Sequence, residues 1–423
     1  MMTQAAGLAA KNRVRRAGLG AFESGRASAG GQQQSTYPAV GSLGLRDFRY
    51  SFFRSCSSSK NNLTTSRGRT NLSIIVPKAD RIKLIKQLQE LRGGTTVISY
   101  ITSTRQGLEI PMAMDSIRKF YDHIKLIGKP RDHTKIDLFL HSNGGDGTVP
   151  WRLVTLLREH ASRFAVLVPY KAYSAATLTA LGADSIVMHP IGMLGPTDPT
   201  VANPFNPRDP NNQPIGISVE DVSAYIALVR EDAGINHEDQ VVEAFKVLAD
   251  KIHPLALGNV KRSLSQSRMM ATKLLALHMT KPEDEHKIKE IVEKLTSKLF
   301  YHGHPINRSE AKQPIGLPTI EDPPTEVEDV MWKLYLDYEA EIKMEEPFDA
   351  AMEFIALNPT KISFTTPLIT AILGFIESIG RTDVYSLDYM LSGGPLPPGP
   401  GGVPMAGGVN VGMAVRRKGW TKE

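Results

Sequence analysis

The sequence predicts an α/β protein with a largely parallel β-sheet. Short runs rich in β-branched and aromatic residues alternate with longer segments of helical periodicity between residues 72 and 189. Polar turns with glycine or other small residues follow several of these runs, at the carboxyl ends of strands, where such sheets bind ligands. A length of 423 residues with 41% hydrophobic residues allows a substantial core.

The individual elements follow from local patterns. Ile82, Ile85, Leu88 and Leu91 share one helical face, and Gly93 can end that helix. The segment TTVISYI is β-branched and predicts a strand, while proline near the start of VPWRLVTLLREHA is tolerated in a first helical turn. Strands are therefore predicted at 72–76, 95–101, 136–141, 164–168 and 185–189, and helices at 79–93, 113–127, 149–161 and 174–183.

The later part of the chain predicts mostly helices. Residues 219–300 have helical patterns, a turn-rich segment follows at 300–318, and further helices are predicted at 325–346 and 364–380. We expect an α/β domain over 71–320 and an acidic helical extension over 321–390, which packs on the core or on an oligomer neighbour. The segment LSGGPLPPGPGGVPMAGGVN begins a tail, 391–423, that we expect to be disordered.

The first 70 residues differ in composition from the rest. They are rich in Gly, Ser, Ala, Gln and Arg, without sustained periodicity, and we expect them to be disordered. They carry eleven Lys or Arg against two carboxylates, a net charge of +9. Because the whole chain has a net charge of +6, residues 71–423 carry −3. The folded part therefore gives no electrostatic support for nucleic-acid binding. An Arg- and Ser-rich start also resembles an organelle import segment; otherwise a cytoplasmic location is expected.

Cysteine content and apolar runs exclude other classes. Cys56 is the single cysteine, which rules out an intramolecular disulfide and disfavours a cysteine-based metal site. The apolar runs are short, far below the roughly 20 residues needed to cross a bilayer. We expect no membrane span, no metal and no organic cofactor.

Three turns carry candidate chemistry. Gly144-Gly145 between a strand and a helix is either a plain turn or a loop whose N–H groups face an oxyanion. Ser174 at a strand-to-helix turn is either an N-cap or an exposed nucleophile. The loop MHPIGMLGPTDPT offers His189 and Asp198 as acid or base groups, although a histidine before proline is usually only a loop residue.

Taken together, these turns resemble the serine dehydrogenase proteinase family, Clp-fold serine proteinases related to the Clp protease proteolytic subunit and signal peptide peptidase A. The segments that carry the resemblance, in order, are HSNGG, SAATLTALGAD, LGPTDP and YHGHPINRSEAKQPIGLP, within residues 71–320. The resemblance implies a ClpP/crotonase-like spiral of βαβ units with additional helices, and a serine peptidase activity.

The resemblance also implies roles for residues. Ser174 falls on the nucleophile position, the N–H groups of Gly145 and Ala175 would form the oxyanion hole, and Gly144 would shape the loop. Two departures stand out: Asn143 replaces the usual proline, and Ala175-Ala176 replaces two glycines. Alanine still supplies an N–H and allows close packing, so neither change removes the chemistry.

The general base is not assigned by the sequence. A serine hydroxyl needs a hydrogen-bonded partner to become nucleophilic. Asp198 stands 24 residues after Ser174, near the position of the Clp histidine, and His189 stands 15 after. Relatives that resemble signal peptide peptidase use a lysine. The other candidates are His141, Lys171, Lys246, Lys251, His302 and His304.

Three functions remain open at this point. The leading hypothesis is a serine peptidase that acts on a peptide or protein substrate, self-associates by analogy with its relatives, and depends on a separate protein for any unfolding, because the chain has no ATPase motif. The second is a catalytically inactive scaffold or binding protein of the same fold. The third is a crotonase-type acyl-CoA enzyme, which needs an oxyanion hole but no serine at 174.

Overall fold

The computed structural model describes six stretches of the chain, which belong to one compact unit over residues 71–423. These stretches are 79–201, 203–210, 212–297, 303–357, 363–395 and 409–422. The expected disordered segment 1–70 and the expected strand 72–76 lie outside the described residues.

The main sheet was expected to be largely parallel, and about half of it is. The strands of this half run in the order β1-β2-β3-β5-β9, and every neighbouring pair is parallel. Strands β2 and β3 are buried on both faces over nearly their whole length, which explains their long apolar runs. Their bounds are β1 Thr96–Thr102, β2 Lys135–His141, β3 Arg163–Val168, β5 Ser185–Met188 and β9 Ile320–Glu321.

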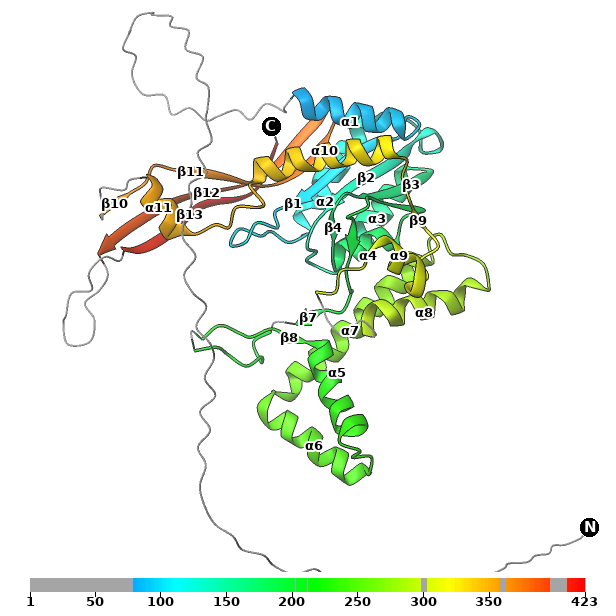
Figure 1. Cartoon of the computed structure of the whole chain (residues 1–423), viewed down its shortest axis with the longest axis vertical. Coiled ribbons are helices and arrows are strands. Elements are labelled where there is room, and N and C mark those ends of the chain that lie inside the picture. The colour runs from blue at the N-terminus through cyan, green and yellow to red at the C-terminus, as the bar shows by residue number, and fades with distance from the viewer. Residues whose placement is uncertain are drawn as a thin grey trace, which may run out of the picture. The chain divides into compact units, whose positions relative to one another are not determined.

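The other half of the sheet is antiparallel. Strand β11 pairs with β1, β12 pairs with β11 along most of its length, and β10 and β13 both pair with β12 (Figure 1). Their bounds are β10 Phe364–Thr365, β11 Ile369–Ser378, β12 Arg381–Pro395 and β13 Val409–Lys422.

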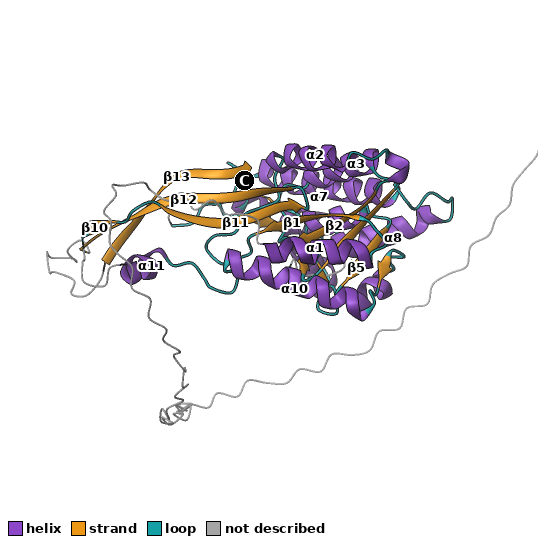
Figure 2. Cartoon of the chain, turned by 90° about the horizontal axis from the view of Figure 1, so that it is seen from above, coloured by secondary structure: helices purple, strands orange, loops and turns teal. Residues whose placement is uncertain are grey.

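Helices cover both faces of the parallel strands (Figure 2). Helices α1 (Ala79–Leu91) and α10 (Thr325–Ile342) bury their apolar sides against one face. The other face carries a larger core, formed with α2 Asp115–Ile127, α3 Val149–His160, α4 Ala175–Leu181, α7 Pro254–Leu275 and α8 Asp284–Ser297. The predicted α/β class and the predicted order of elements between 79 and 189 are confirmed.

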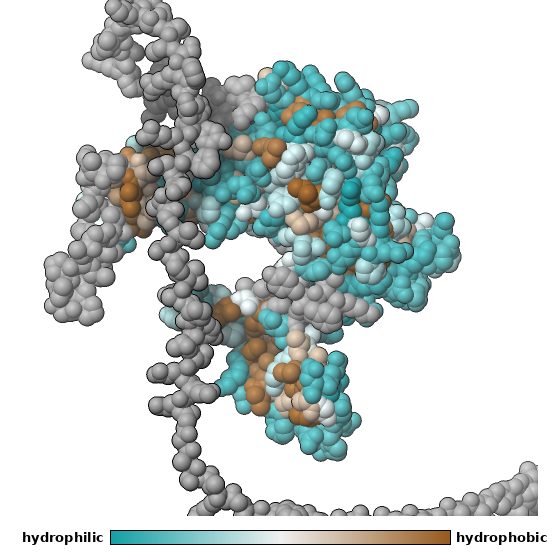
Figure 3. Space-filling model, in the orientation of Figure 1, coloured by the Kyte–Doolittle hydropathy of each residue, from teal (hydrophilic) through white to brown (hydrophobic). Residues whose placement is uncertain are grey.

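A helical lobe directly precedes α7 in the chain. It consists of α5 (Val219–Ala227), the π-helix η2 (Leu228–Asp232) and α6 (Glu238–Lys251), so the prediction of helices after 219 is confirmed. Helix α6 buries none of its residues, and apolar side chains gather on the surface of this lobe (Figure 3). The remaining short elements are η1 Arg131–His133, β4 Lys171–Ala172, β6 Met193–Leu194, β7 Thr200–Val201, β8 Ile217–Ser218, α9 Arg308–Glu310, η3 Ala311–Ile315 and α11 Ala350–Leu357.

The C-terminal predictions are partly wrong. Helix α10 was expected, but the expected helix at 364–380 is replaced by β10 and β11, so 321–390 is not a purely helical extension. The expected disorder of 391–423 is also wrong for residues 391–395 and 409–422, which belong to β12 and β13. A long apolar run fits a buried strand as well as a helix, and here its backbone pairs with β1 and β12.

Arg81 joins the helical layer to the sheet through a buried ionic network. Its side chain is 1% exposed, and its guanidinium pairs with Asp337 and Glu341 of α10 and lies 3.4 Å from the carboxylate of Glu377 on β11. Tyr338 donates a hydrogen bond of 2.7 Å to the same Glu377 carboxylate. Removing the cation would leave several carboxylates in a poorly solvated site.

We therefore expect Arg81→Met to lower the free energy of unfolding by about 3–5 kcal/mol, the usual cost of breaking a buried ion pair from one side. Lys83→Met is the matched control on the same helix, because Lys83 is exposed and its one ion pair among the described residues is with the exposed Asp80. That control should change stability by less than about 0.5 kcal/mol. Urea denaturation followed by tryptophan fluorescence measures both; equal midpoints for the two variants would contradict the role given to Arg81.

Candidate active site

The glycine loop after β2 can be built only with glycine. Gly144 has φ +94° and Gly145 has φ +154°, in the region that other residues rarely adopt. A Cβ on Gly144 would lie 2.6 Å from the Tyr173 carbonyl oxygen and 2.8 Å from Ser174 Cβ. On Gly145 it would lie 2.4 Å from the carbonyl oxygen of Met112. The loop is therefore packed against the Ser174 turn on one side and the Met112 backbone on the other.

Met112 fixes the position of this loop. Its N–H donates to the Gly144 carbonyl at 2.8 Å, and its carbonyl accepts from Asp146 N–H at 2.9 Å. This parallel bridge flanks Gly145 and leaves the Gly145 N–H without an acceptor among the described residues. The Ala175 N–H likewise makes no hydrogen bond in the described part of the chain. Two donors of the kind an oxyanion hole requires are thus open.

Ser174 stands at a strained turn between β4 and α4. Its backbone has φ 51° and ψ −113°, one of three non-glycine residues with positive φ among those described. It occupies the N-cap position, yet its side chain makes no capping hydrogen bond. The described residues provide no hydrogen-bond partner for its hydroxyl. The interpretation of Ser174 as an ordinary N-cap therefore lacks the bond that would justify it.

Ser142 couples the glycine loop to the Ser174 turn. Its N–H donates to the carbonyl of Lys171 at 2.9 Å, and its carbonyl accepts from Tyr173 N–H at 3.0 Å. Its buried hydroxyl accepts from Gly144 N–H at 3.0 Å and from the Thr102 hydroxyl at 2.7 Å. One residue thereby sets the register between the two open N–H groups and the serine.

Thr177 attaches the third predicted turn to α4. Its hydroxyl donates to the Ala172 carbonyl at 2.7 Å and accepts from Gly195 N–H at 2.9 Å. Two residues on, Thr197 N–H donates to Leu295 of α8 at 2.9 Å, and the Ser267 hydroxyl of α7 donates to the Thr197 carbonyl. The loop after β6 is thus fastened to both α4 and α7.

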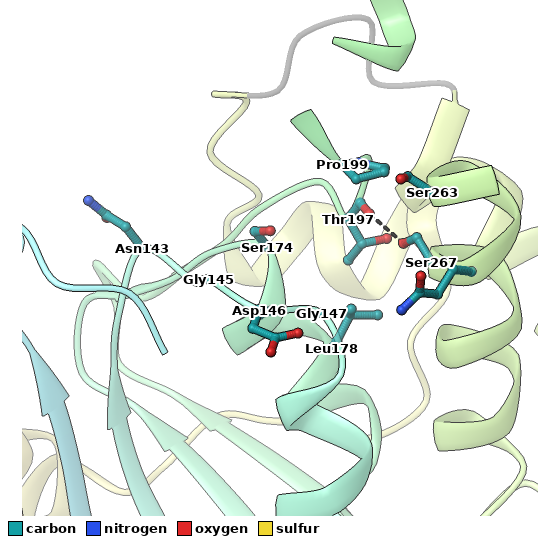
Figure 4. A pocket seen from close by; sticks show the side chains of 12 residues that line it. Asn143, Gly145, Asp146, Gly147, Ser174, Leu178, Thr197, Pro199, Ser263 and Ser267 are labelled. Atoms are coloured by element: carbon teal, nitrogen blue, oxygen red, sulfur yellow. Dashed lines mark hydrogen bonds between the residues drawn. The ribbon is translucent and has the colours of Figure 1, made fainter. Parts of the chain in front are cut away.

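These segments enclose a cleft of about 450 Å³ with Ser174 on one wall (Figure 4). The glycine loop and the Ser174 turn form one side of the cleft. Thr197 and Pro199 of the loop after β6, together with α7, form the opposite side. The residues that line it are Asn143, Gly145, Asp146, Gly147, Ser174, Ala175, Leu178, Thr197, Pro199, Ser263, Gln266 and Ser267. The α7 wall had no signal in the sequence analysis.

The structure does not bring His189 to this cleft. Its ring stacks on Trp332 of α10 with centroids 5.3 Å apart, and burial together with Arg308 lowers its pKa. Asp198 is buried between Thr197 and Pro199, and its side chain is not among the lining groups. Neither side chain lines the cleft, and a role for Asp198 beside Ser174 stays a prediction.

None of the other candidate bases that the structure describes lines the cleft. His141 is buried on the α10 side, stacked 6.0 Å from Tyr170, and accepts from Lys171 N–H at 3.3 Å. His304 bonds Glu310 at 2.7 Å, and Lys246 bonds Glu243 at 2.7 Å. The Lys171 ammonium lies 4.7 Å from the Tyr170 ring, Lys251 ends α6, and His302 lies outside the described residues. The cleft wall, as far as the described chain forms it, holds no His or Lys.

A Ser–His–Asp arrangement does occur elsewhere, between α2 and the β11–β12 hairpin. Ser378 Oγ lies 2.7 Å from His123 Nδ1, and His123 Nε2 lies 3.2 Å from Asp383. His123 is 1% exposed and Asp383 also binds Lys119 and Arg381. Because His123 and Asp383 are buried and the carboxylate is paired with Lys119 and Arg381, we interpret the cluster as a structural link between α2 and the hairpin.

Residues 71–213 match the family model of the ClpP-like SDH-type serine proteinases. This match confirms the resemblance predicted from the three turns and assigns the region a ClpP-like peptidase fold. The matched segment contains Gly144, Gly145 and Ser174 and ends before α7.

Two relatives are uncharacterised proteins of Methanocaldococcus jannaschii. One is 26% identical over 236 residues, which cover 55% of this chain and 69% of the relative. The other is 26% identical over 253 residues, which cover 59% of this chain and 77% of the relative.

Two solved structures of mutants of the 1510-N membrane-bound stomatin-specific protease are also similar. One, in complex with a substrate peptide, is 14% identical, covers 55% of this chain and 78% of that chain, and has a TM-score of 0.31. The other is 18% identical, covers 36% and 69%, and has a TM-score of 0.22.

Two further features of the chain bear on the sequence predictions. The helices among the described residues include none that is long and apolar enough to cross a bilayer. The same residues contain no cluster of three His, Cys, Asp or Glu side chains that could hold a metal ion. The cytoplasmic location stays a prediction.

His141 gives a pH prediction. Burial, aided by Lys171, lowers its pKa from 6.5 to about 3, so the folded chain keeps it neutral. Between pH 6.5 and about 3 the unfolded chain binds a proton that the folded chain excludes. This group therefore lowers the free energy of unfolding by about 1.4 kcal/mol for each unit by which the pH decreases in that range. His141→Asn should flatten the pH dependence of the urea midpoint between pH 7 and about 4.5. His286→Gln, at an exposed site, should not; identical slopes for wild type and His141→Asn would refute the assignment.

Proposed function

We propose that this protein is a serine peptidase that cleaves peptide bonds by acyl transfer through Ser174. One observation carries the proposal: a serine in a strained turn, with a free hydroxyl, stands beside two open backbone N–H groups on the wall of a cleft. The match of residues 71–213 to serine proteinases supports the same function.

In the proposed mechanism Ser174 Oγ attacks the carbonyl carbon of the scissile bond. The C–O bond forms as the hydroxyl proton passes to a base, and negative charge develops on the carbonyl oxygen. The N–H groups of Gly145 and Ala175 stabilise that oxyanion, and such donors can each contribute about 10²–10³ in rate. The C–N bond then breaks, the amine leaves with a proton, and water hydrolyses the acyl-enzyme.

The departures from the family pattern fit this geometry. Ala175 and Ala176 are buried in the core beneath the turn, where their methyl groups pack and the Ala175 N–H remains open. Asn143 lies on the cleft wall. Its substitution for proline leaves Gly144 and Gly145 in place. The proposal therefore assigns the oxyanion hole as the sequence analysis did.

The base is the part of the machinery that the cleft does not supply. Asp146 is the one acidic or basic residue among the described lining residues, and its Oδ1 accepts from the Thr148 N–H and hydroxyl at 2.8 and 2.7 Å. We propose that the active form is a homo-oligomer, because proteins of this fold generally self-associate, and that the chain must assemble before it is active.

A second function is favoured by a different observation, the absence of His and Lys among the described residues of the cleft wall. A cleft without His or Lys on its described walls suits a protein that binds peptides without cleaving them. Such a protein would keep the open N–H groups as a recognition site for a backbone carbonyl or carboxylate. The following experiment separates the two functions.

Labelling with a fluorophosphonate probe tests whether Ser174 is an activated nucleophile. We expect wild type to be labelled and Ser174→Ala to be unlabelled. Ser265→Ala is the matched control, because Ser265 is an exposed serine of α7 whose hydroxyl, within the described part of the chain, donates only to the Lys261 carbonyl of its own helix. Absence of labelling in folded, assembled wild type would reject the peptidase and leave the binding protein.

Gly144→Ala tests the oxyanion loop. A Cβ there would overlap the Tyr173 carbonyl and the Ala175 N–H, so the loop must shift, and labelling should slow about 100-fold. Gly258→Ala is the control: Gly258 lies inside α7 with open space around it, and alanine is the better helix former. The rate of probe labelling is measured for both variants. Equal rates would mean that the glycine loop does not contribute to the reaction of Ser174 with the probe.

A further inference from the structure

We infer that Asp146 sets the substrate preference of the cleft, selecting peptides with Lys or Arg beside the scissile bond. This inference rests on the proposed function, because it names the substrate class of the same site. Asp146 follows Gly145 directly, so its side chain lies one residue from the proposed oxyanion hole (Figure 4).

The charge of the cleft is the first argument. Eleven of the twelve lining residues are neutral, and the twelfth is Asp146. In the described part of the chain, Asp146 makes no ion pair with any Lys or Arg. A substrate cation that enters the cleft therefore meets a carboxylate that is not already neutralised, while a substrate carboxylate meets like charge.

The orientation of the carboxylate is the second argument. Oδ1 is held by the Thr148 N–H and hydroxyl at the entry to α3, and the backbone N–H of Asp146 is held by Met112. Neither hydrogen bond uses Oδ2. The side chain is thereby fixed in place by one oxygen while the other stays open to a donor, and a pre-positioned acceptor loses little entropy when a ligand binds.

The remaining wall suits the backbone of a peptide rather than a particular charge. Ser263, Gln266 and Thr197 offer neutral donors and acceptors opposite Ser174, and Leu178 supplies an apolar contact. Such groups hydrogen-bond any extended peptide and discriminate little between side chains. Discrimination by charge then falls to Asp146.

The test measures peptide binding to the Ser174→Ala protein, so that it is independent of turnover. Three fluorescent peptides are compared by anisotropy, identical except for Lys, norleucine or Glu at one position. With Asp146 intact, the Lys peptide should bind about fivefold tighter than the norleucine peptide, the upper range for an exposed ion pair, and less so at high salt. The Glu peptide should bind weakest.

Two variants decide the origin of the preference. Asp146→Asn keeps the acceptor for Thr148 but removes the charge, so the Lys preference should disappear. Asp146→Lys should reverse it in favour of Glu. Asp132→Asn, at an exposed carboxylate on η1, is the control and should retain the preference.

The outcomes separate this inference from the proposed function. Equal binding of the Lys and norleucine peptides, or a Lys preference that survives in Asp146→Asn, would overturn the role of Asp146 whatever the probe labelling shows. If wild type is not labelled by the probe but the Lys preference is present and depends on Asp146, the peptidase would be rejected and the recognition site kept.

Discussion

The hydrogen bonds of Ser142 are the constraint on which the candidate site depends. Its backbone pairs with Lys171 and Tyr173, and its hydroxyl receives Gly144 N–H, so a single buried residue aligns two turns that belong to different βα units. The parallel sheet brings both turns to the same edge, because β2 and β3 are neighbours that run in the same direction. Without this link the glycine loop and the serine would be two unrelated turns; with it they form one rigid arrangement.

Close packing makes that arrangement intolerant of change. Gly144 lies so near the Ser174 turn that no side chain fits between them, and Ser174 itself adopts a backbone conformation that costs of order 1–3 kcal/mol. The surrounding contacts must offset this strain: Thr177 ties the start of α4 to Ala172 and Gly195, and Ala175 and Ala176 pack into the core. Strain concentrated at a serine beside open N–H groups is the feature that distinguishes a reactive turn from an ordinary helix start.

The sequence predicted the parts of this protein that have a strong local pattern. The elements from 79 to 189 follow from apolar periodicity, and the glycine and serine turns were found because their residue types and order are distinctive. The α7 wall was missed, since Ser263, Gln266 and Ser267 on a helix look like solvent-facing polar residues until tertiary contacts bring them opposite Ser174. Strand β13 was missed because glycines interrupt its alternation in VNVGMAV and the segment before it is rich in Pro and Gly.

The hydrogen bond between Thr197 and Ser267 joins residues that are 70 positions apart in the chain. A ribosome synthesises the serine, the glycine loop and the strands beneath them well before it reaches α7, and domains generally begin to fold from the N-terminal side. In a nascent chain that ends before residue 254, Ser174 therefore lacks the cleft wall that α7 forms, and its turn is open to solvent on that side. The cleft is complete only when α7 packs against the loop after β6. The Ser174 turn is therefore synthesised, and can fold, before the cleft around it forms.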